Sequence, residues 1–162
     1  MRYLLVGALL LIGRQTLADA TVHGKAAALV FTEHGFSIEP PAGHDYTQVQ
    51  QVVALALPTV GGFSPNVNVQ VQPFKGTMEE YLTLTRGQFK ANGVKMIVEK
   101  HDARSAALEF SGPFGGQDLH WYSRAFLAKN GVILATATAS EAQWPRLGAT
   151  LRQSVDSLRL TP

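Results

Sequence analysis

The chain of 162 residues contains no cysteine. Disulfides, a thiol nucleophile, a cysteine zinc site and an iron–sulfur cluster are therefore excluded, as is a lipid anchor attached to cysteine. Clusters of lysine and arginine are also lacking, because the 14 basic residues are dispersed and balanced by 12 acidic ones. Nucleic-acid binding, which needs a concentrated basic surface, is not indicated.

Long apolar runs are scarce, and the one at the start of the chain has the features of an export signal. Arg2 precedes the apolar run Tyr3–Ile12, which is too short to span a bilayer, and Ala18-Asp19-Ala20 matches a signal peptidase site. We therefore expect a signal peptide over residues 1–20, cleaved after Ala20; the alternative is an uncleaved N-terminal anchor. No second run is long enough for a membrane span.

Removal of this segment takes two arginines and one aspartate with it, so the mature chain is nearly neutral. Residues 21–162 have the length of one domain. An exported domain without disulfides fits a bacterial periplasm, so we expect a periplasmic or secreted protein.

Residue alternation and turn residues predict eight strands and two helices. The strands are expected at residues 27–32, 35–39, 49–57, 66–72, 94–99, 105–111, 117–129 and 131–139, and the helices at residues 77–92 and 144–160. The pair Asn130-Gly131 predicts a tight hairpin between the last two strands. Because hairpin connections dominate, the order predicts a single α+β domain, with a mostly antiparallel twisted sheet flanked by two main helices.

Both helices have recognisable starts. Thr77 with Glu80 three residues later forms a capping box, and Pro145 fits the first turn of the second helix. Gly87 in the interior of the first helix costs stability, and we expect it to permit close packing on the sheet.

Four stretches of the chain resemble the PsbP-like superfamily, especially its small bacterial envelope proteins of DcrB type. They are "FSIEPPAGH" (Phe36–His44), "SPNVNVQVQPFKGTMEEYL" (Ser64–Leu82), "WYSRAFLAKNGVILATATAS" (Trp121–Ser140) and "LRQSVDSLRL" (Leu151–Leu160). The resemblance runs from about Gly35 to Leu158 and implies a twisted antiparallel sheet with helices on its faces.

The same resemblance implies a function without catalysis. Superfamily members assist a photosystem, bind a small GTPase or act as chaperones for secreted toxins, and the family pattern offers no catalytic residue to carry over. This chain departs from many DcrB-type members, which are lipoproteins, because it has no cysteine for the lipid.

Two rows of polar side chains are candidates for partner recognition. One row alternates with Val67, Val69 and Val71; the other lies on the long strand at residues 117–129. Tyrosine and arginine are enriched in protein interfaces, so a protein partner is the leading functional interpretation. The alternative is that the amides face water and the second row is covered by the second helix. The candidate partner-binding residues are Asn66, Asn68, Gln70, His120, Tyr122 and Arg124.

Nothing in the sequence forms a catalytic constellation. The motifs G-x-S-x-G and S-x-x-K are absent, and Glu109 is expected to be an exposed strand glutamate. The histidines lack the spacing of metal ligands on one element, although loop histidines could still converge. They are His23, His34, His44, His101 and His120.

We therefore expect a non-enzymatic periplasmic accessory or binding protein, immunity- or adaptor-like, that recognises a protein partner. The alternative is a small-ligand or divalent-metal-binding envelope protein that uses loop histidines. No catalytic residue, metal ligand or cofactor is assigned, and the sequence does not indicate an oligomeric state.

Overall fold

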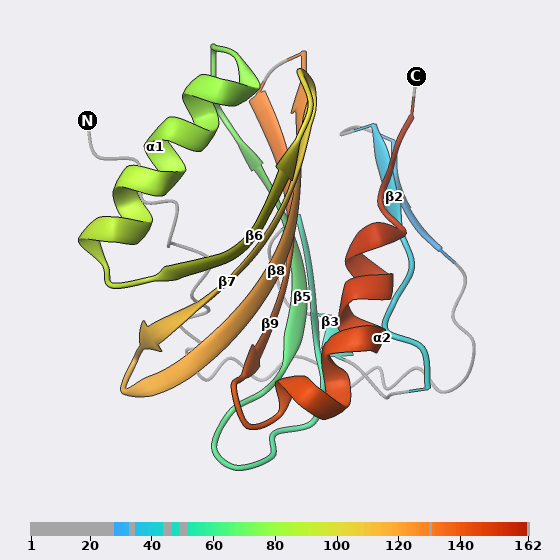
Figure 1. The fold of residues 1–162 in the computed structure, drawn as a ribbon. Coiled ribbons are helices and arrows are strands. Elements are labelled where there is room, and N and C mark those ends of the chain that lie inside the picture. Colours follow the sequence, from blue (N-terminus) through green and yellow to red (C-terminus); the bar gives the residue numbers. More distant parts are fainter. Residues whose placement is uncertain (1–27, 33–34, 44–46, 49–51, 130, 162) are drawn as a thin grey trace.

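The structure is a computed structural model that describes residues 28–32, 35–43, 47–48, 52–129 and 131–161 (Figure 1). Within these ranges lie two helices, α1 (Met78–Ala91) and α2 (Trp144–Asp156). The strands are β1 (Leu29–Phe31), β2 (Phe36–Ile38), β3 (Thr47–Gln48), β4 (Val53–Ala56), β5 (Asn66–Gln72), β6 (Lys95–His101), β7 (Ser105–Phe114), β8 (Gln117–Ala128), β9 (Gly131–Ser140) and β10 (Arg159–Leu160).

Seven strands form one sheet in the order β3-β4-β5-β9-β8-β7-β6, and each recorded pairing in it is antiparallel. Strands β1, β2 and β10 form a second, smaller antiparallel sheet. Figure 1 shows α1 on one side of the twisted large sheet and α2 on the other, which we call the α1 side and the α2 side. The predicted α+β class, with a mostly antiparallel sheet and two flanking helices, is confirmed.

The alternation in β5 decides which side chains reach which side of the sheet. Val67 and Val69 are fully buried on the α2 side, where they pack with Leu151 and Val155 of α2. The amides of β5 point to the α1 side. There α1 covers a second apolar cluster on strands β7, β8 and β9. The core is thus split by the sheet into two layers.

Helix α1 begins as predicted. The hydroxyl of Thr77 accepts from the Glu80 N–H, and the Glu80 carboxylate accepts from the Thr77 N–H at 2.7 Å, which completes a capping box. One stripe of the helix is buried against the sheet: Met78, Tyr81, Leu82, Thr85 and Phe89.

Gly87 does not have the packing role predicted for it. It is exposed on α1, and a Cβ atom placed there would meet nothing within 4 Å. We therefore expect Gly87→Ala to raise the free energy of unfolding by about 1 kcal/mol, the difference in helix propensity between the two residues. Urea denaturation followed by circular dichroism measures this change.

Gly131→Ala is the contrasting substitution, because a Cβ atom at this position would overlap the Gln72 carbonyl oxygen. This variant should be destabilised. A Gly87→Ala protein that is no more stable than the wild type would contradict the exposed position of this residue.

Helix α2 begins at Trp144 with Pro145 in its first turn, as predicted, but it ends at Asp156 rather than at Leu160. The chain then turns so that Leu158 returns to the core and β10 pairs with β2. The Ser157 hydroxyl accepts from the Glu39 N–H and donates to the Ser154 carbonyl, which stabilises the turn. In the described part of the chain, no helix is long and apolar enough to cross a membrane.

Two strand predictions also need correction. The strand expected over residues 49–57 is shorter than predicted: β4 covers only Val53–Ala56, after a bend at Val52. It pairs with β3, which lies before the predicted range, and residues 49–51 lie outside the described ranges. The loop expected after residue 111 is shorter than predicted. Strand β7 continues to Phe114, and only Gly115 and Gly116, both with positive φ, form the turn. Asn130 of the other predicted hairpin turn is not described, but the strands that flank it pair as expected.

Candidate functional site

An ionic cluster lies on the α2 side of the sheet, where three elements meet. Arg152 of α2 donates from both terminal nitrogens to the Glu109 carboxylate of β7, with 2.7 Å between Nη1 and Oε2. His120 of the adjacent strand β8 places Nε2 at 2.8 Å from Glu109 Oε1. The side chains of His120 and Glu109 are each only 9% exposed. Glu109 was expected to be exposed on its strand; instead it is buried and paired, because α2 carries Arg152 over it.

The second ring nitrogen of His120 faces another carboxylate. Nδ1 lies 3.2 Å from both oxygens of Glu141, in the turn before α2. The ring stacks on Trp144 with a centroid separation of 4.1 Å and an interplanar angle of 17°. Both ring nitrogens and one ring face of His120 are therefore occupied by other side chains.

Tyr122 and Arg124, two and four residues after His120 on β8, both reach α2. The Tyr122 hydroxyl donates to Asp156 Oδ1 at 2.8 Å, and Arg124 Nη1 donates to the same oxygen at 3.1 Å. Burial and the hydrogen bond to Asp156 raise the pKa of Tyr122, so the phenol stays protonated and keeps its donor role. These side chains are half-buried at the margin of α2, with Arg152 placed 5.4 Å from the Tyr122 ring centre.

The amide row of β5 lies on the opposite side of the sheet. Asn68 is 1% exposed and donates from Nδ2 to Asn66 Oδ1 at 3.3 Å, whereas Asn66 and Gln70 are partly buried. The last amide, Gln72, accepts from the hydroxyl of Tyr81 of α1 at 2.8 Å. Burial raises the pKa of Tyr81, which keeps this donor in place.

The six predicted site residues therefore do not form one surface. Asn66, Asn68 and Gln70 face the α1 side, whereas His120, Tyr122 and Arg124 face the α2 side beneath or beside the helix. Sequence reasoning missed the partners of the second group because they come from elements distant in the chain. These partners are Glu109, Glu141, Trp144, Arg152 and Asp156.

The histidines give no support to a metal site in the described ranges. His101 of β6 lies 3.3 Å from Glu79 and 3.5 Å from Glu99, but Arg86 already pairs with both carboxylates. Among the residues that the structure describes, no group of three side chains could hold a metal ion. The other predicted loop histidines, His23, His34 and His44, lie outside the described residues.

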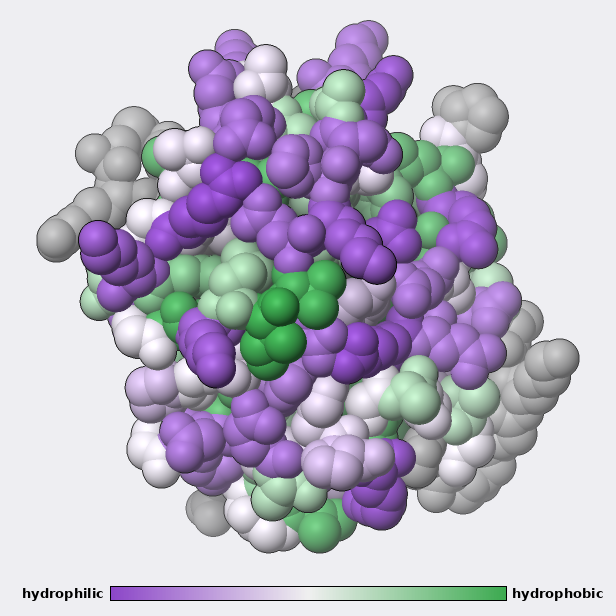
Figure 2. All heavy atoms as spheres, viewed as in Figure 1, coloured by the Kyte–Doolittle hydropathy of each residue, from purple (hydrophilic) through white to green (hydrophobic). Residues whose placement is uncertain are grey.

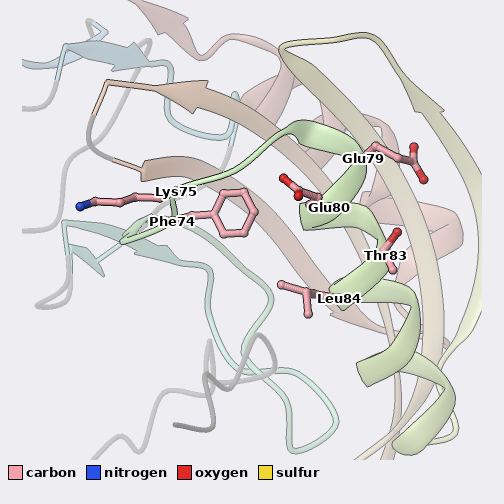
Figure 3. Close-up of a pocket in the computed structure, with 6 residues that line it drawn as sticks. All are labelled: Phe74, Lys75, Glu79, Glu80, Thr83 and Leu84. Carbon is pink, nitrogen blue, oxygen red and sulfur yellow. The ribbon is translucent and has the colours of Figure 1, made fainter.

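A hollow of about 420 Å³ lies between α1 and the segment that follows β5. Figure 3 shows the residues that line it. Its wall is formed by Phe74, Lys75 and four residues of α1: Glu79, Glu80, Thr83 and Leu84. The Glu80 carboxylate is engaged in the helix cap and Glu79 pairs with Arg86, while Lys75 points away from the helix.

Strand β6 forms one edge of the large sheet and lies at the front of Figure 1, between α1 and α2. Ile97 and Val98 at its middle are 46% and 36% exposed, and the register with β7 shifts at this point. Such a shift marks a β-bulge, which is common on edge strands. Figure 2, seen from the same direction, shows a largely hydrophilic surface with a compact apolar patch near its centre.

No family model matches the sequence, and no curated protein matches it. Solved structures, in contrast, share the fold. PA94 from Pseudomonas aeruginosa, a protein of unknown function considered a candidate regulator, aligns with a TM-score of 0.60 and 17% identity over 86% of this chain and 99% of its own. Cyanobacterial PsbP (CyanoP) from Synechocystis sp. PCC 6803 aligns with a TM-score of 0.57 and 13% identity over 93% of this chain and 98% of its own.

The fold is PsbP-like. LpqN, a Mycobacterium tuberculosis protein involved in cell envelope biogenesis, also shares this fold, with a TM-score of 0.51 and 13% identity over 88% of this chain and 90% of its own. At these identities the likeness concerns the arrangement of strands and helices. It does not extend to the DcrB type or to a binding site.

Proposed function

We propose that this chain is a non-enzymatic accessory or binding protein of the bacterial envelope, of DcrB type, that recognises a protein partner. The observation that carries the proposal is the open edge strand β6, with aliphatic side chains exposed at Ile97 and Val98. Exposed apolar groups on a strand edge that no other described strand covers are suited to contact with another protein.

The arrangement of the titratable groups supports a role without catalysis. His120 and Glu109 are buried in mutual contact and with Arg152, and the acidic residues beside α1 pair with Arg86 or cap the helix. These groups stabilise the contacts between elements. An envelope location follows from the predicted signal peptide and is compatible with the involvement of LpqN in cell envelope biogenesis.

Affinity capture tests the proposal. The protein is expressed with its own leader and a C-terminal tag in the native host, and is purified from the envelope fraction. We expect one host protein at near-stoichiometric amount, and we expect Val98→Asp to reduce its recovery strongly, since a charge replaces an exposed aliphatic side chain at the centre of β6.

Leu84→Asp is the matched control, because Leu84 is 55% exposed on α1, away from the edge strand. The proposal fails if no host protein is recovered, or if recovery is the same for Val98→Asp, Leu84→Asp and the wild type. Mass spectrometry of the same preparation checks the leader: the expected N-terminal residue is Thr21.

A further inference from the structure

Strand β6 has one paired edge and one open edge. Its partner is β7 on one edge, and among the described residues no strand pairs with the other. Helix α1 lies against one side of the sheet and leaves the edge itself uncovered in Figure 1. An edge of this kind presents backbone N–H and C=O groups to an added strand.

The register places a particular set of side chains on the α2 side of β6. Cross-strand partners in an antiparallel pair point to the same side. Val98 is opposite Glu109 and Lys100 is opposite Ala107, while Lys95 is opposite Ser111, which is itself opposite His120. Since Glu109 and His120 face α2, the α2 side of β6 presents Lys95, Val98 and Lys100 in that order.

This side of the edge strand is positively charged. Lys95 and Lys100 are exposed, and neither takes part in an ion pair within the described ranges. The acidic residue of the strand, Glu99, faces the other side, where Arg86 neutralises it with a contact of 2.6 Å. The pattern along the edge is therefore basic, apolar, basic.

The same lysines oppose pairing between two copies of the chain. In the antiparallel register that sets Ile97 of one copy against Val98 of another, Lys95 of each copy lies opposite Lys100 of the other. Like charges directly opposite each other are destabilising. The edge is thus protected against a second copy but is complementary to a strand with the opposite charge pattern.

We propose that β6 is the docking site for an acidic, extended segment of the protein partner, which adds to the large sheet as a further strand. Backbone hydrogen bonds along β6 supply the affinity. Carboxylates of the segment contact Lys95 and Lys100, and an apolar side chain between them covers Val98. This inference rests on the proposed function, because it names the chemistry of the partner for the same edge.

The first test uses a synthetic peptide with the sequence Thr-Glu-Thr-Val-Thr-Glu-Thr, whose residues on one side of a strand are Glu, Val and Glu. The ¹⁵N-labelled protein is titrated with the peptide at low ionic strength. We expect the NMR chemical shifts of the backbone amides from Lys95 to His101 to change, with little change in β4 and β5. Binding should weaken at 0.5 M NaCl, because salt screens exposed charges.

Two controls decide whether the lysine charges and the open edge of β6 are responsible for binding of the acidic peptide. A peptide with Lys in place of both Glu residues should not shift the β6 amides. The double variant Lys95→Glu, Lys100→Glu should weaken binding of the acidic peptide at least about tenfold, whereas Lys75→Glu, an exposed lysine outside the sheet, should leave it unchanged. Shifts outside β6, equal binding of the two peptides, or no binding would overturn the inference.

The captured host protein separates this inference from the proposed function. Loss of the host protein from the Lys95→Glu, Lys100→Glu variant supports both. If this variant retains the host protein while Val98→Asp loses it, the partner binds at the edge, but the proposal that its docking segment is acidic is wrong. If no host protein is captured and the peptide does not bind, both fail.

Discussion

Replacement of Arg152 by methionine is expected to lower the free energy of unfolding by about 2–3 kcal/mol, because a buried carboxylate loses its charged partner. Glu109 would keep only the contact with His120, in a position where its side chain is 9% exposed. Methionine retains most of the apolar stem. The guanidinium group, whose Cζ lies 5.4 Å from the ring centres of Tyr122 and Trp144, is lost together with the ion pair. Urea denaturation measures the difference.

Arg146→Met is the matched control, since Arg146 lies exposed on the same helix and joins no ion pair within the described residues. Its effect should stay within about 0.5 kcal/mol. The double variant Glu109→Leu, Arg152→Met should be less destabilised than the sum of the two single variants, because it leaves no unpaired carboxylate. An Arg152→Met protein as stable as Arg146→Met would contradict a buried pair.

Replacement of Leu151 by alanine is expected to cost about 3 kcal/mol, within the range for leucine in a rigid core. Leu151 is fully buried at the centre of the face that α2 presents to the sheet, where Leu147 and Val155 also lie. Its loss leaves a cavity between α2 and β5. Thermal and urea unfolding should both show the decrease.

Leu84→Ala provides the comparison on the other helix, because Leu84 is 55% exposed. We expect its free energy of unfolding to change by no more than about 0.5 kcal/mol. Similar effects of the two substitutions would mean that α2 does not pack on the sheet as described here.

Arg152→Met and Leu151→Ala both act on the contact between α2 and the sheet. This contact decides which side chains on the α2 side are accessible to a partner. With α2 in place, His120 is enclosed, and Tyr122 and Arg124 are bound to Asp156. The part of this side that remains open lies beyond the helix, along β6 and β7. A partner surface is therefore expected at the edge of the sheet rather than at its centre.

The sequence predicted the elements well where local chemistry dominates. The capping box at Thr77 and Glu80, the start of α2 at Trp144 and the alternation in β5 were all recognisable, because each depends on neighbours a few residues away. The end of α2 was missed for the opposite reason. Residues 159–160 are held by pairing with β2, a strand more than a hundred positions earlier in the chain.

The candidate site was harder to predict than the fold. Alternation shows that His120, Tyr122 and Arg124 share one side of a strand, but it does not show what covers that side. Glu109 was predicted to be an exposed strand residue because its ion-pair partner, Arg152, lies 43 positions away on another element. A functional surface depends on such coverage, so the open edge at Ile97 and Val98 could be found only in the folded chain.

By itself, the sequence determined the class of the fold, the two helices, the hairpin order and the exclusion of cysteine chemistry. All of these follow from local propensity, periodicity or composition. The tertiary structure decided that the amide row and the His120 row face opposite sides, that α2 encloses one of them, and that β6 remains an open edge. These facts depend on strand order and on contacts between distant residues, which a single sequence does not specify.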